Sequence, residues 1–518
     1  MRYFNIAGPC NKLEHYMIEA ATRLQGVEQL IDMKQYFVIY AARQSGKTTY
    51  LQDLAGRLNA SGNYYTLYCS LKAAQGITDP KEAIPQIVKK IKYVLKLYNI
   101  PHGDNFAKDA DYDNYMGVLN IELTTLCASL DKPLILLFDE VDCLSEGVLI
   151  TFLRQLRDGY NNRSQFPFVH SIALVGMRNI RDYKAQVRPE SQSLGSSSPF
   201  NIVTESLTLK NFTKEEICQL YQQHTNETGQ VFEEDAVELV WQQTQGQPWL
   251  VNAVAREVIV KILQSDYTQP VTVERVAKAI HTIILRRDTH IDSLLERLKE
   301  ERVRKVMEPI IMGEDIFDRT SDNFQYVMDL GLISTARGEL APANPIYAEV
   351  IARTLTYSMQ QKLVEDKNTY SAPHYIKGGR IDMDFLLCDF QQFWRENSDI
   401  WTTKFDYEEA APQLILMAFL QRVVNGGGQL IREMAAGTGR LDICLVYEGQ
   451  KYPIELKLWR GEKSLEAGVE QTLHYMDVYG ATEGWLALFD RTPQTPWDEK
   501  IYMERRIVDG KTVTIVGL

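Results

Sequence analysis

Short apolar runs alternate with helical patterns between Tyr36 and about residue 202. The runs that predict strands are YFVIY (36–40), YYTLYCS (64–70), PLILLFDE (133–140) and VHSIALVG (169–176). A Ser-, Gly- and Pro-rich stretch, RPESQSLGSSSPF, predicts a loop before NIVTESLTL. Strands that alternate with helices are typical of a parallel sheet covered by helices, so we expect an α/β fold in this part of the chain.

The pattern becomes helical after about residue 205. Thr213 is a good N-cap with Glu216 three residues later, so a helix should begin there. Farther on, a helix with apolar residues on one face from Ile291 to Leu298 precedes another helix and a short hairpin, an order that suggests a winged helix. The predicted parts are an α/β core (1–204), a helical lid (205–287), the winged helix (288–357), a linker (358–380) and a second α/β domain (381–518).

Composition limits the classes of function. The 518 residues, 45% of them hydrophobic, suffice for three or four domains of roughly 100 to 200 residues each. The net charge of -12 repels phosphate, which argues against a constitutive coat for DNA but not against a small active site that meets nucleic acid transiently.

Cysteine usage and hydropathy favour a reducing cytoplasm. Seven scattered cysteines without a CxxC pair indicate neither a disulfide framework nor a zinc site. The opening stretch has no basic segment followed by an apolar one, and no apolar run reaches about 18 residues. We therefore expect neither a signal peptide nor a membrane partner.

The stretch YFVIYAARQSGKTTYLQDLAGRL combines a strand, a tight loop and a helix. Backbone N–H groups of such a loop surround phosphate, Lys47 would reach the terminal phosphates, and Thr48 would offer its hydroxyl to Mg²⁺. The usual loop pattern begins with glycine, whereas Ala41 stands there, so we expect a tighter entry. A chance GKT at a helix start is disfavoured by the flanking strand and helix. The candidate nucleotide-binding residues of the loop are Gln44, Ser45, Gly46, Lys47, Thr48 and Thr49.

Two further strands end in polar residues. The apolar run in LILLFDEVD ends in Asp139 and Glu140, where a Walker B motif has a Mg²⁺-directing aspartate and a glutamate that activates water. Burying an isolated carboxylate costs free energy, so charges at the end of a buried strand indicate a specific role. IALVGMRN ends with Arg178 and Asn179, in position to sense the γ-phosphate. A solvated loop arginine is the alternative for Arg178.

These motifs resemble those of the AAA+ and STAND class of P-loop ATPases, particularly its archaeal-type branch, over residues 1 to about 357. Gly246, Gln247 and Pro248 in TQGQPWLVN look like the GxP motif with which STAND lids touch the nucleotide. The opening FNIAGPCNKLEHYM resembles the segment that closes over adenine, with Tyr16 or His15 as stacking partners and a core or cap role as the alternative. The resemblance implies an ATP-dependent switch that forms a homo-oligomer on activation by a protein or nucleic-acid trigger.

The expected winged helix carries little positive charge. Its recognition stretch, TSDNFQYVMDLGL, has Asp322 and Asp329 but no lysine or arginine. Contact with DNA phosphates is unfavourable there, so a packing or relay role is preferred to DNA reading.

Three charges fall on apolar strands in RLDICLVYEGQKYPIELK (440–457). If Gly449 and Gln450 form a two-residue turn, Asp442 faces Lys457 and lies diagonal to Glu455, all on one side of the hairpin. Two carboxylates at about 4 Å repel by roughly 4 kcal/mol at an effective dielectric near 20, so the arrangement asks for a cation. Mg²⁺, or Mn²⁺, suits oxygen ligands, and Lys457 would steady the attacking water or the phosphoryl charge.

This arrangement resembles the PD-(D/E)XK nuclease superfamily. Gln471 and Tyr475, four residues apart on a helix, look like its QxxxY motif, and Glu409 stands where its first helix often carries an acid. Leu441 replaces the usual proline before Asp442. A salt bridge at a strand edge, or a nuclease fold kept only for binding, is the alternative.

The sequence therefore predicts a STAND-like ATPase with helical lid and winged helix, coupled to a Mg²⁺-dependent nuclease. The expected substrate is nucleic acid, with DNA favoured over RNA, and the domain pairing suggests a role in prokaryotic defence. The competing class is a nucleotide-gated DNA-binding or scaffolding protein with an inert terminal domain.

Overall fold

The computed structural model describes most of the chain in two compact units. The described residues are 1–19, 23–176, 203–286, 289–311, 319–335, 340–351, 354, 372–404, 416–417, 419–420, 429–433, 442–490, 492 and 495–518. The amino-terminal unit comprises Met1–His290 and Thr320–Leu332, and the carboxy-terminal unit comprises Ile291–Arg319 and Ile333–Leu518.

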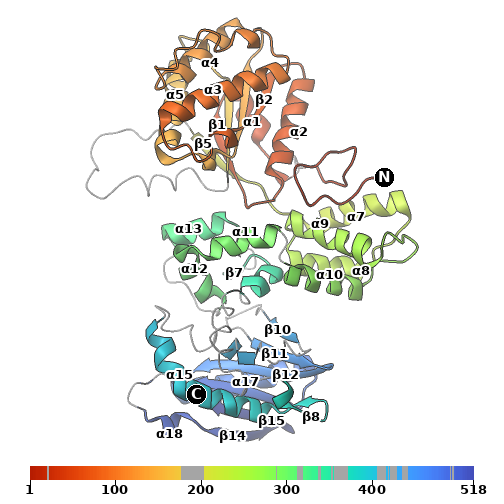
Figure 1. Ribbon diagram of the computed structural model, residues 1–518. Coiled ribbons are helices and arrows are strands. Elements are labelled where there is room, and N and C mark those ends of the chain that lie inside the picture. Colours follow the sequence, from red (N-terminus) through yellow and green to blue (C-terminus); the bar gives the residue numbers. More distant parts are fainter. Residues whose placement is uncertain are drawn as a thin grey trace. The chain divides into compact units, whose positions relative to one another are not determined.

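A five-stranded parallel sheet forms the centre of the amino-terminal unit (Figure 1), in the order β2-β3-β4-β1-β5. Its strands are β1 (Tyr36–Tyr40), β2 (Tyr65–Ser70), β3 (Leu134–Asp139), β4 (Ser171–Gly176) and β5 (Val203–Thr208). The predicted α/β fold and its strands are confirmed to within about two residues. The helices of this part are α1 (Val27–Asp32), α2 (Lys47–Ala60), α3 (Pro80–Leu97), α4 (Val118–Ser129) and α5 (Glu146–Asn162).

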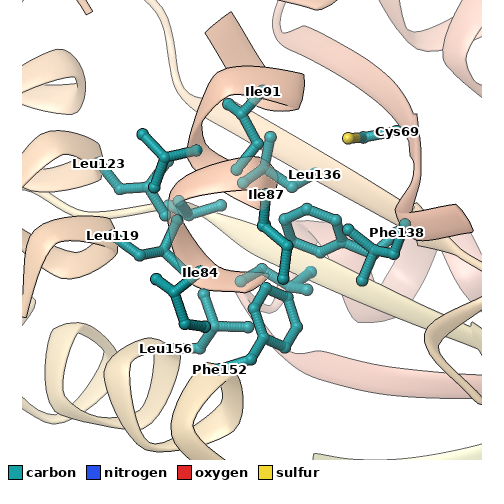
Figure 2. Packing of buried hydrophobic residues seen from close by; sticks show 14 of the residues in the cluster. Cys69, Ile84, Ile87, Ile91, Leu119, Leu123, Leu136, Phe138, Phe152 and Leu156 are labelled. Atoms are coloured by element: carbon teal, nitrogen blue, oxygen red, sulfur yellow. The ribbon is translucent and has the colours of Figure 1, made fainter. Parts of the chain in front are cut away.

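Both faces of this sheet are buried, which is why its strands read as nearly continuous apolar runs. On β1, Val38 belongs to the core beneath α3, α4 and α5, whereas the next residue, Ile39, belongs to the core beneath α1 and α2. Figure 2 shows isoleucines of α3 gathered with Leu136 and Phe138 of β3. The ring of Phe138 meets that of Phe152 edge-on, with centroids 5.2 Å apart.

Four α-helices follow the sheet, with one π-helical segment among them. They are α7 (Lys214–Thr228), α8 (Glu234–Thr244), α9 (Pro248–Arg256), the π-helical segment Glu257–Ile262 and α10 (Val273–Arg286). The predicted start after Thr213 is confirmed: Glu216 N donates to Thr213 Oγ1 at 3.2 Å, and Thr213 N donates to Glu216 Oε2 at 2.9 Å. The two residues thus satisfy each other's backbone donors.

Helices and a hairpin follow in the order predicted for residues 288–357. The elements are α11 (Thr289–Leu298), α12 (Glu301–Ile311), α13 (Asp322–Asp329) and the antiparallel pair β6 (Ile333–Ser334) and β7 (Ala341–Pro342). Ile291, Leu294 and Leu298 are buried on one face of α11, as the pattern predicted. The designation as a winged helix, and the finer domain boundaries, stay predictions.

The carboxy-terminal unit contains a mixed sheet in the order β10-β11-β12-β13-β15-β14 (Figure 1). Its strands are β10 (Gln429–Glu433), β11 (Asp442–Tyr447), β12 (Gln450–Leu458), β13 (Glu483–Phe489), β14 (Met503–Val508) and β15 (Lys511–Gly517). Its helices are α15 (Met383–Lys404), α17 (Glu462–Tyr479) and α18 (Trp497–Lys500), and the small hairpin β8 (Ile376–Lys377) with β9 (Arg380–Ile381) reaches into the predicted linker. Leu465 and Met476 of α17 share a core with strands β13 and β15.

The turn between β11 and β12 corrects the predicted register. Tyr447 pairs with Gln450, so the two turn residues are Glu448 and Gly449, not Gly449 and Gln450. Both have positive φ, 46° and 80°, as a type I′ turn requires. Because Ile443 pairs with Ile454, the next ladder position places Asp442 opposite Glu455 rather than opposite Lys457.

No helix in the described parts of the chain is both long enough and apolar enough to cross a membrane.

Candidate functional site

In the loop between β1 and α2, the side chain of Lys47 donates hydrogen bonds to the backbone of the loop itself. Lys47 Nζ donates to the carbonyls of Ala41 and Ala42 at 2.6 and 2.8 Å, and Ser45 Oγ donates to that of Ala42 at 2.8 Å. The tight path needs left-handed backbone at Gln44 (φ 57°) and at Gly46 (φ 95°), the N-cap of α2. Ala41 fits in place of glycine because its methyl group belongs to the core beneath α1 and α2.

Burial lowers the pKa of Lys47 to about 8, while nearby Asp142 and Asp139 act in the opposite direction. Only the charged ammonium attracts phosphate strongly, so ATP affinity should be full at pH 7 and decline as pH rises through 8. We expect the dissociation constant to rise about tenfold between pH 7 and pH 9. Calorimetric titrations with ATP across this range check it. A flat profile would contradict the assignment of Lys47, and the weak binding left in Lys47→Ala should not follow the curve.

Thr48 and Asp139 meet at the start of α2 and the end of β3. Asp139 Oδ2 accepts from Thr48 Oγ1 at 2.7 Å and from the phenol of Tyr68 at 3.1 Å, and Oδ1 accepts from Glu140 N at 2.9 Å. The carboxyl is 2% exposed, and burial raises its pKa. A hydroxyl and a carboxylate joined in this way fit Mg²⁺, which Thr48 and Asp139 would hold.

Glu140, the second carboxylate, is held by the end of β2. Its Oε2 accepts from Ser70 Oγ at 2.6 Å, and Lys72 Nζ lies 3.9 Å from Oε1. Its left-handed backbone (φ 58°) turns the chain out of the strand. Sequence reasoning missed Tyr68 and Ser70; the available signal was that two polar residues of β2 lie two apart at the edge where β3 also ends.

The GxP motif forms a turn that only glycine can begin. Gly246 has φ 70°, Phe212 N donates to its carbonyl at 2.8 Å, and a Cβ on Gly246 would lie 1.9 Å from Phe212 O. Gln247 then caps α9 by accepting from Leu250 N at 2.6 Å, and Pro248 takes the first helical position.

Gly246→Ala should lower the free energy of unfolding of the amino-terminal unit by about 2 kcal/mol or more, because backbone strain adds to the clash with Phe212. Gly229→Ala is the matched control: Gly229 has φ 78° but open space around its Cβ position. It should cost only about 1 kcal/mol, the strain alone. Denaturant titrations of both variants measure the difference, and equal losses would show that the contact with Phe212 is unimportant.

The opening segment packs on both α7 and α2. Tyr16 is buried with its ring edge-on to His224, centroids 5.4 Å apart, and His15 Nδ1 accepts from Asn11 N at 2.8 Å. These are the core and cap roles that were the alternative to adenine stacking, which stays a prediction. Cys10 N donates to Thr49 Oγ1 at 3.0 Å, so Thr49 joins this segment to the helix that follows the loop.

Arg178 and Asn179 lie outside the described residues. Sequence reasoning also missed Arg23, whose Nη2 donates to the Ser45 carbonyl at 2.9 Å. A single arginine ahead of the first helix belongs to no motif that was recognised, so local pattern gave no signal for it.

In the carboxy-terminal unit, Glu455 and Lys457 form a buried pair on β12. Glu455 is 1% exposed and Lys457 3%, and Lys457 Nζ lies 2.9 Å from Glu455 Oε1. Lys457 Nζ also donates to Gln471 Oε1 of α17. The helix lies close because it carries Gly468, where a Cβ would lie 3.1 Å from Lys457 Cγ. Tyr475 follows Gln471 by one turn and is half-buried.

Two further acidic residues, Asp442 and Glu409, were predicted to belong to this site. Asp442 occupies the ladder position opposite Glu455, and Glu409 falls outside the described residues. Within those residues, no three metal-binding side chains gather at one point. The carboxylate of Glu455 offers oxygen donors of the kind that Mg²⁺ prefers.

A family model described as an AAA-like domain matches residues 12–353. The chain belongs to the AAA-like domain family. The matched range contains Lys47, Asp139 and the Gly246–Pro248 turn, so the amino-terminal unit of this AAA-like protein is a P-loop ATPase module. The match leaves the strands from β10 to β15 outside.

Solved structures resemble this AAA-like protein more distantly. A Walker-type ATPase of Pyrococcus abyssi shares 12% identity over 67% of this chain and 99% of its own, with a TM-score of 0.47. The Holliday junction branch migration motor RuvB of Thermotoga maritima shares 12% over 62% and 89%, with a TM-score of 0.32. Aeropyrum pernix Orc1 in complex with DNA shares 14% over 64% and 88%, with a TM-score of 0.30. No curated protein sequence matches the chain.

Proposed function

We propose that this AAA-like protein is an ATP-dependent switch that controls a Mg²⁺-dependent nuclease in its carboxy-terminal domain. The contact that supports the nuclease most directly is the buried Glu455–Lys457 pair with Gln471 on the adjoining helix. Burying two opposite charges is costly and is often no more stable than an apolar pair. A buried pair is therefore weak as a stabilising device and more easily explained by chemistry.

The pair offers the groups that phosphodiester hydrolysis needs. In this reaction water attacks phosphorus and the bond to one ester oxygen breaks. Lys457 would stabilise the negative charge that grows on the phosphoryl oxygens, since a cation in a water-excluded site interacts strongly. Gln471 would orient its ammonium, and Glu455 would keep it charged. Mg²⁺, when bound, would activate the attacking water and polarise the phosphoryl group.

Contacts at the phosphate loop support a switch. Gly331, in the turn after α13, has φ 71°, and a Cβ there would lie 2.4 Å from Ala42 Cβ. Gly331 thus lies against the same loop whose carbonyls accept from Lys47. A two-state equilibrium moves from 1:99 to 99:1 only if a ligand favours one state by about 5.5 kcal/mol. Nucleotide that reorganised this loop would affect several packed segments at once.

Purified full-length protein incubated with plasmid, single-stranded DNA and RNA tests the proposal, with Mg²⁺, Mn²⁺ or chelator and with or without ATP. We expect metal-dependent cutting of at least one substrate, DNA first, at a rate that changes with ATP. Absence of cutting under all these conditions would refute the nuclease. Cutting that ignores ATP would refute the control by nucleotide.

The second candidate is a nucleotide-gated DNA-binding or scaffolding protein with an inert nuclease fold. It is favoured by one observation: Lys457 is already engaged by Glu455 and Gln471, as in a structural ion pair. Asp322 at the start of α13 and Asp329 at its end disfavour DNA binding by that helix. Metal-independent retention of DNA without cutting would identify this candidate.

The biological setting is proposed from the pairing of domains alone. An ATPase switch that releases a nuclease suits defence against foreign nucleic acid in a prokaryote, with assembly into a homo-oligomer after a protein or nucleic-acid trigger. Light scattering of the protein with and without ATP and nucleic acid tests the assembly step.

A further inference from the structure

Arg23 contacts both the phosphate loop and the start of the lid. Its Nη2 donates to the Ser45 carbonyl at 2.9 Å, and its Nε donates to the Lys210 carbonyl at 2.8 Å. The guanidinium carbon lies 4.7 Å from the centroid of the Phe212 ring. One planar side chain with donors in fixed directions therefore connects two backbone segments that are distant in sequence.

The environment of Arg23 makes both contacts necessary. The residue is 6% exposed, and burial lowers its pKa to about 10, while Glu216 acts in the opposite direction. A guanidinium taken out of water needs hydrogen bonds to replace its hydration. The carbonyls of Ser45 and Lys210 supply them from two sides, so moving either segment alone would leave buried donors unpaired.

At the loop end, Arg23 lies directly against the backbone that precedes Lys47. A Cβ on Gly46 would lie 3.5 Å from Arg23 Nη1. Lys47 Nζ donates to the carbonyls of Ala41 and Ala42. A phosphate that accepted hydrogen bonds from Lys47 would compete with these carbonyls. The loop, whose Ser45 carbonyl is bound by Arg23, would then have to change conformation.

At the lid end, the contacts continue to the GxP turn. Phe212, which lies under the guanidinium, donates its N–H to Gly246 O at 2.8 Å. The two backbones also approach closely, since a Cβ on Gly246 would lie 1.9 Å from Phe212 O. Pro248 begins α9 two residues after Gly246, so a shift near Lys210 would be passed to this helix.

We propose that Arg23 couples phosphate binding at the loop to the position of the lid. It acts as a positioning residue: it holds Ser45 and Lys210 in one fixed relation, so nucleotide cannot rearrange the loop without moving the Gly246–Pro248 turn. The proposal rests on the ATP-dependent switch proposed above and is independent of the nuclease.

Hydrogen exchange of the full-length protein, with and without a saturating non-hydrolysable ATP analogue, tests the coupling. In the wild type, nucleotide should protect amides of both the loop (41–49) and residues 210–256 of the lid. In Arg23→Met, which keeps a long apolar side chain over Phe212, loop protection should persist while the nucleotide-induced lid protection falls at least about fivefold. Arg57→Met, on α2 with Glu28 and Asp53 as partners, is the matched control and should behave as wild type.

Each outcome of this experiment either supports the coupling or overturns it. Wild-type lid protection in saturated Arg23→Met overturns the proposal, as does a wild type in which nucleotide protects the loop but not the lid. If Arg23→Met does not fold, Arg23→Lys decides: one ammonium cannot reproduce the two fixed donor directions, so full lid protection in that variant overturns the coupling. Absence of loop protection in the wild type would instead refute the ATP-dependent switch on which the coupling rests.

A second readout separates coupling from general loosening. Pro248→Ala should weaken nucleotide affinity in the wild type. The factor by which it raises the dissociation constant should be at least about fivefold smaller in the Arg23→Met background. Additive effects would mean that Arg23 and the lid turn act independently, and would overturn the proposal.

Discussion

Replacing Lys457 with alanine should lower the rate of nucleic-acid cleavage at least about 100-fold, the usual cost of removing a group that stabilises transition-state charge. Lys457 is 3% exposed and its Nζ lies 2.9 Å from Glu455 Oε1, so solvent cannot replace the ammonium. Gel assays under single-turnover conditions with Mg²⁺ would measure the loss. Cutting by Lys457→Ala at the wild-type rate would refute the assignment of β12 as a catalytic strand.

Controls must separate chemistry from folding in this experiment. Removing one partner of a buried ion pair typically costs about 3 to 5 kcal/mol, so Lys457→Ala could also weaken the domain. Glu455→Gln with Lys457→Met removes both charges and should restore stability without restoring cleavage. Lys451→Ala, an exposed lysine of the same strand, should cut as wild type. Cleavage that returned together with stability would favour the inert-fold alternative.

The parallel sheet could be predicted because strands that are buried on both faces appear in the sequence as continuous apolar runs. Runs such as LILLF (134–138) are apolar at every position, since alternate residues enter the two cores. Asp139 and Glu140, the polar residues at the end of this run, could be recognised as candidate site residues for the same reason. Charge at the end of a buried strand departs from the pattern and needs a partner.

The hairpin register was predicted wrongly, yet the prediction that Asp442, Glu455 and Lys457 share one face of the strands does not depend on it. Moving the turn from Gly449–Gln450 to Glu448–Gly449 changes the residue opposite Asp442 from Lys457 to Glu455, a shift of two positions. Side chains alternate faces with a period of two, so a shift of two keeps the same face. The sequence could not choose between the turns because Gly449 fits either one, and positive φ at Glu448 is uncommon outside glycine.

Contacts between segments that are distant in sequence could not be predicted from local sequence patterns. Arg23, Tyr68 and Ser70 owe their roles to what the fold brings beside them: the Ser45 carbonyl, Asp139 and Glu140. Each residue type is common at such positions in strands or near helices, and only the assembled sheet order places β2 next to β3. A pattern-based reading finds groups within one motif, whereas these residues belong to none.

Lys47→Ala should weaken ATP binding at least about 100-fold, since several charge-assisted hydrogen bonds to phosphate are lost, each worth about 1.5 to 3 kcal/mol. Folding should survive, because the hydrogen bonds of Lys47 within the described part of the chain go to carbonyls of its own loop, Ala41 and Ala42. Calorimetric titration measures the affinity, and Lys96→Ala, an exposed lysine of α3, should bind as wild type. Unchanged affinity in Lys47→Ala would refute the phosphate loop.

The same variant links the two proposed activities. If nucleotide controls cutting, Lys47→Ala should cut at one fixed rate with or without ATP, whereas the wild type responds to ATP. Lys457→Ala should show the converse: ATP binds normally and nothing is cut. A Lys47→Ala protein whose cutting still followed ATP would mean that nucleotide acts elsewhere, because Lys47 is the lysine of the loop that reaches the terminal phosphates.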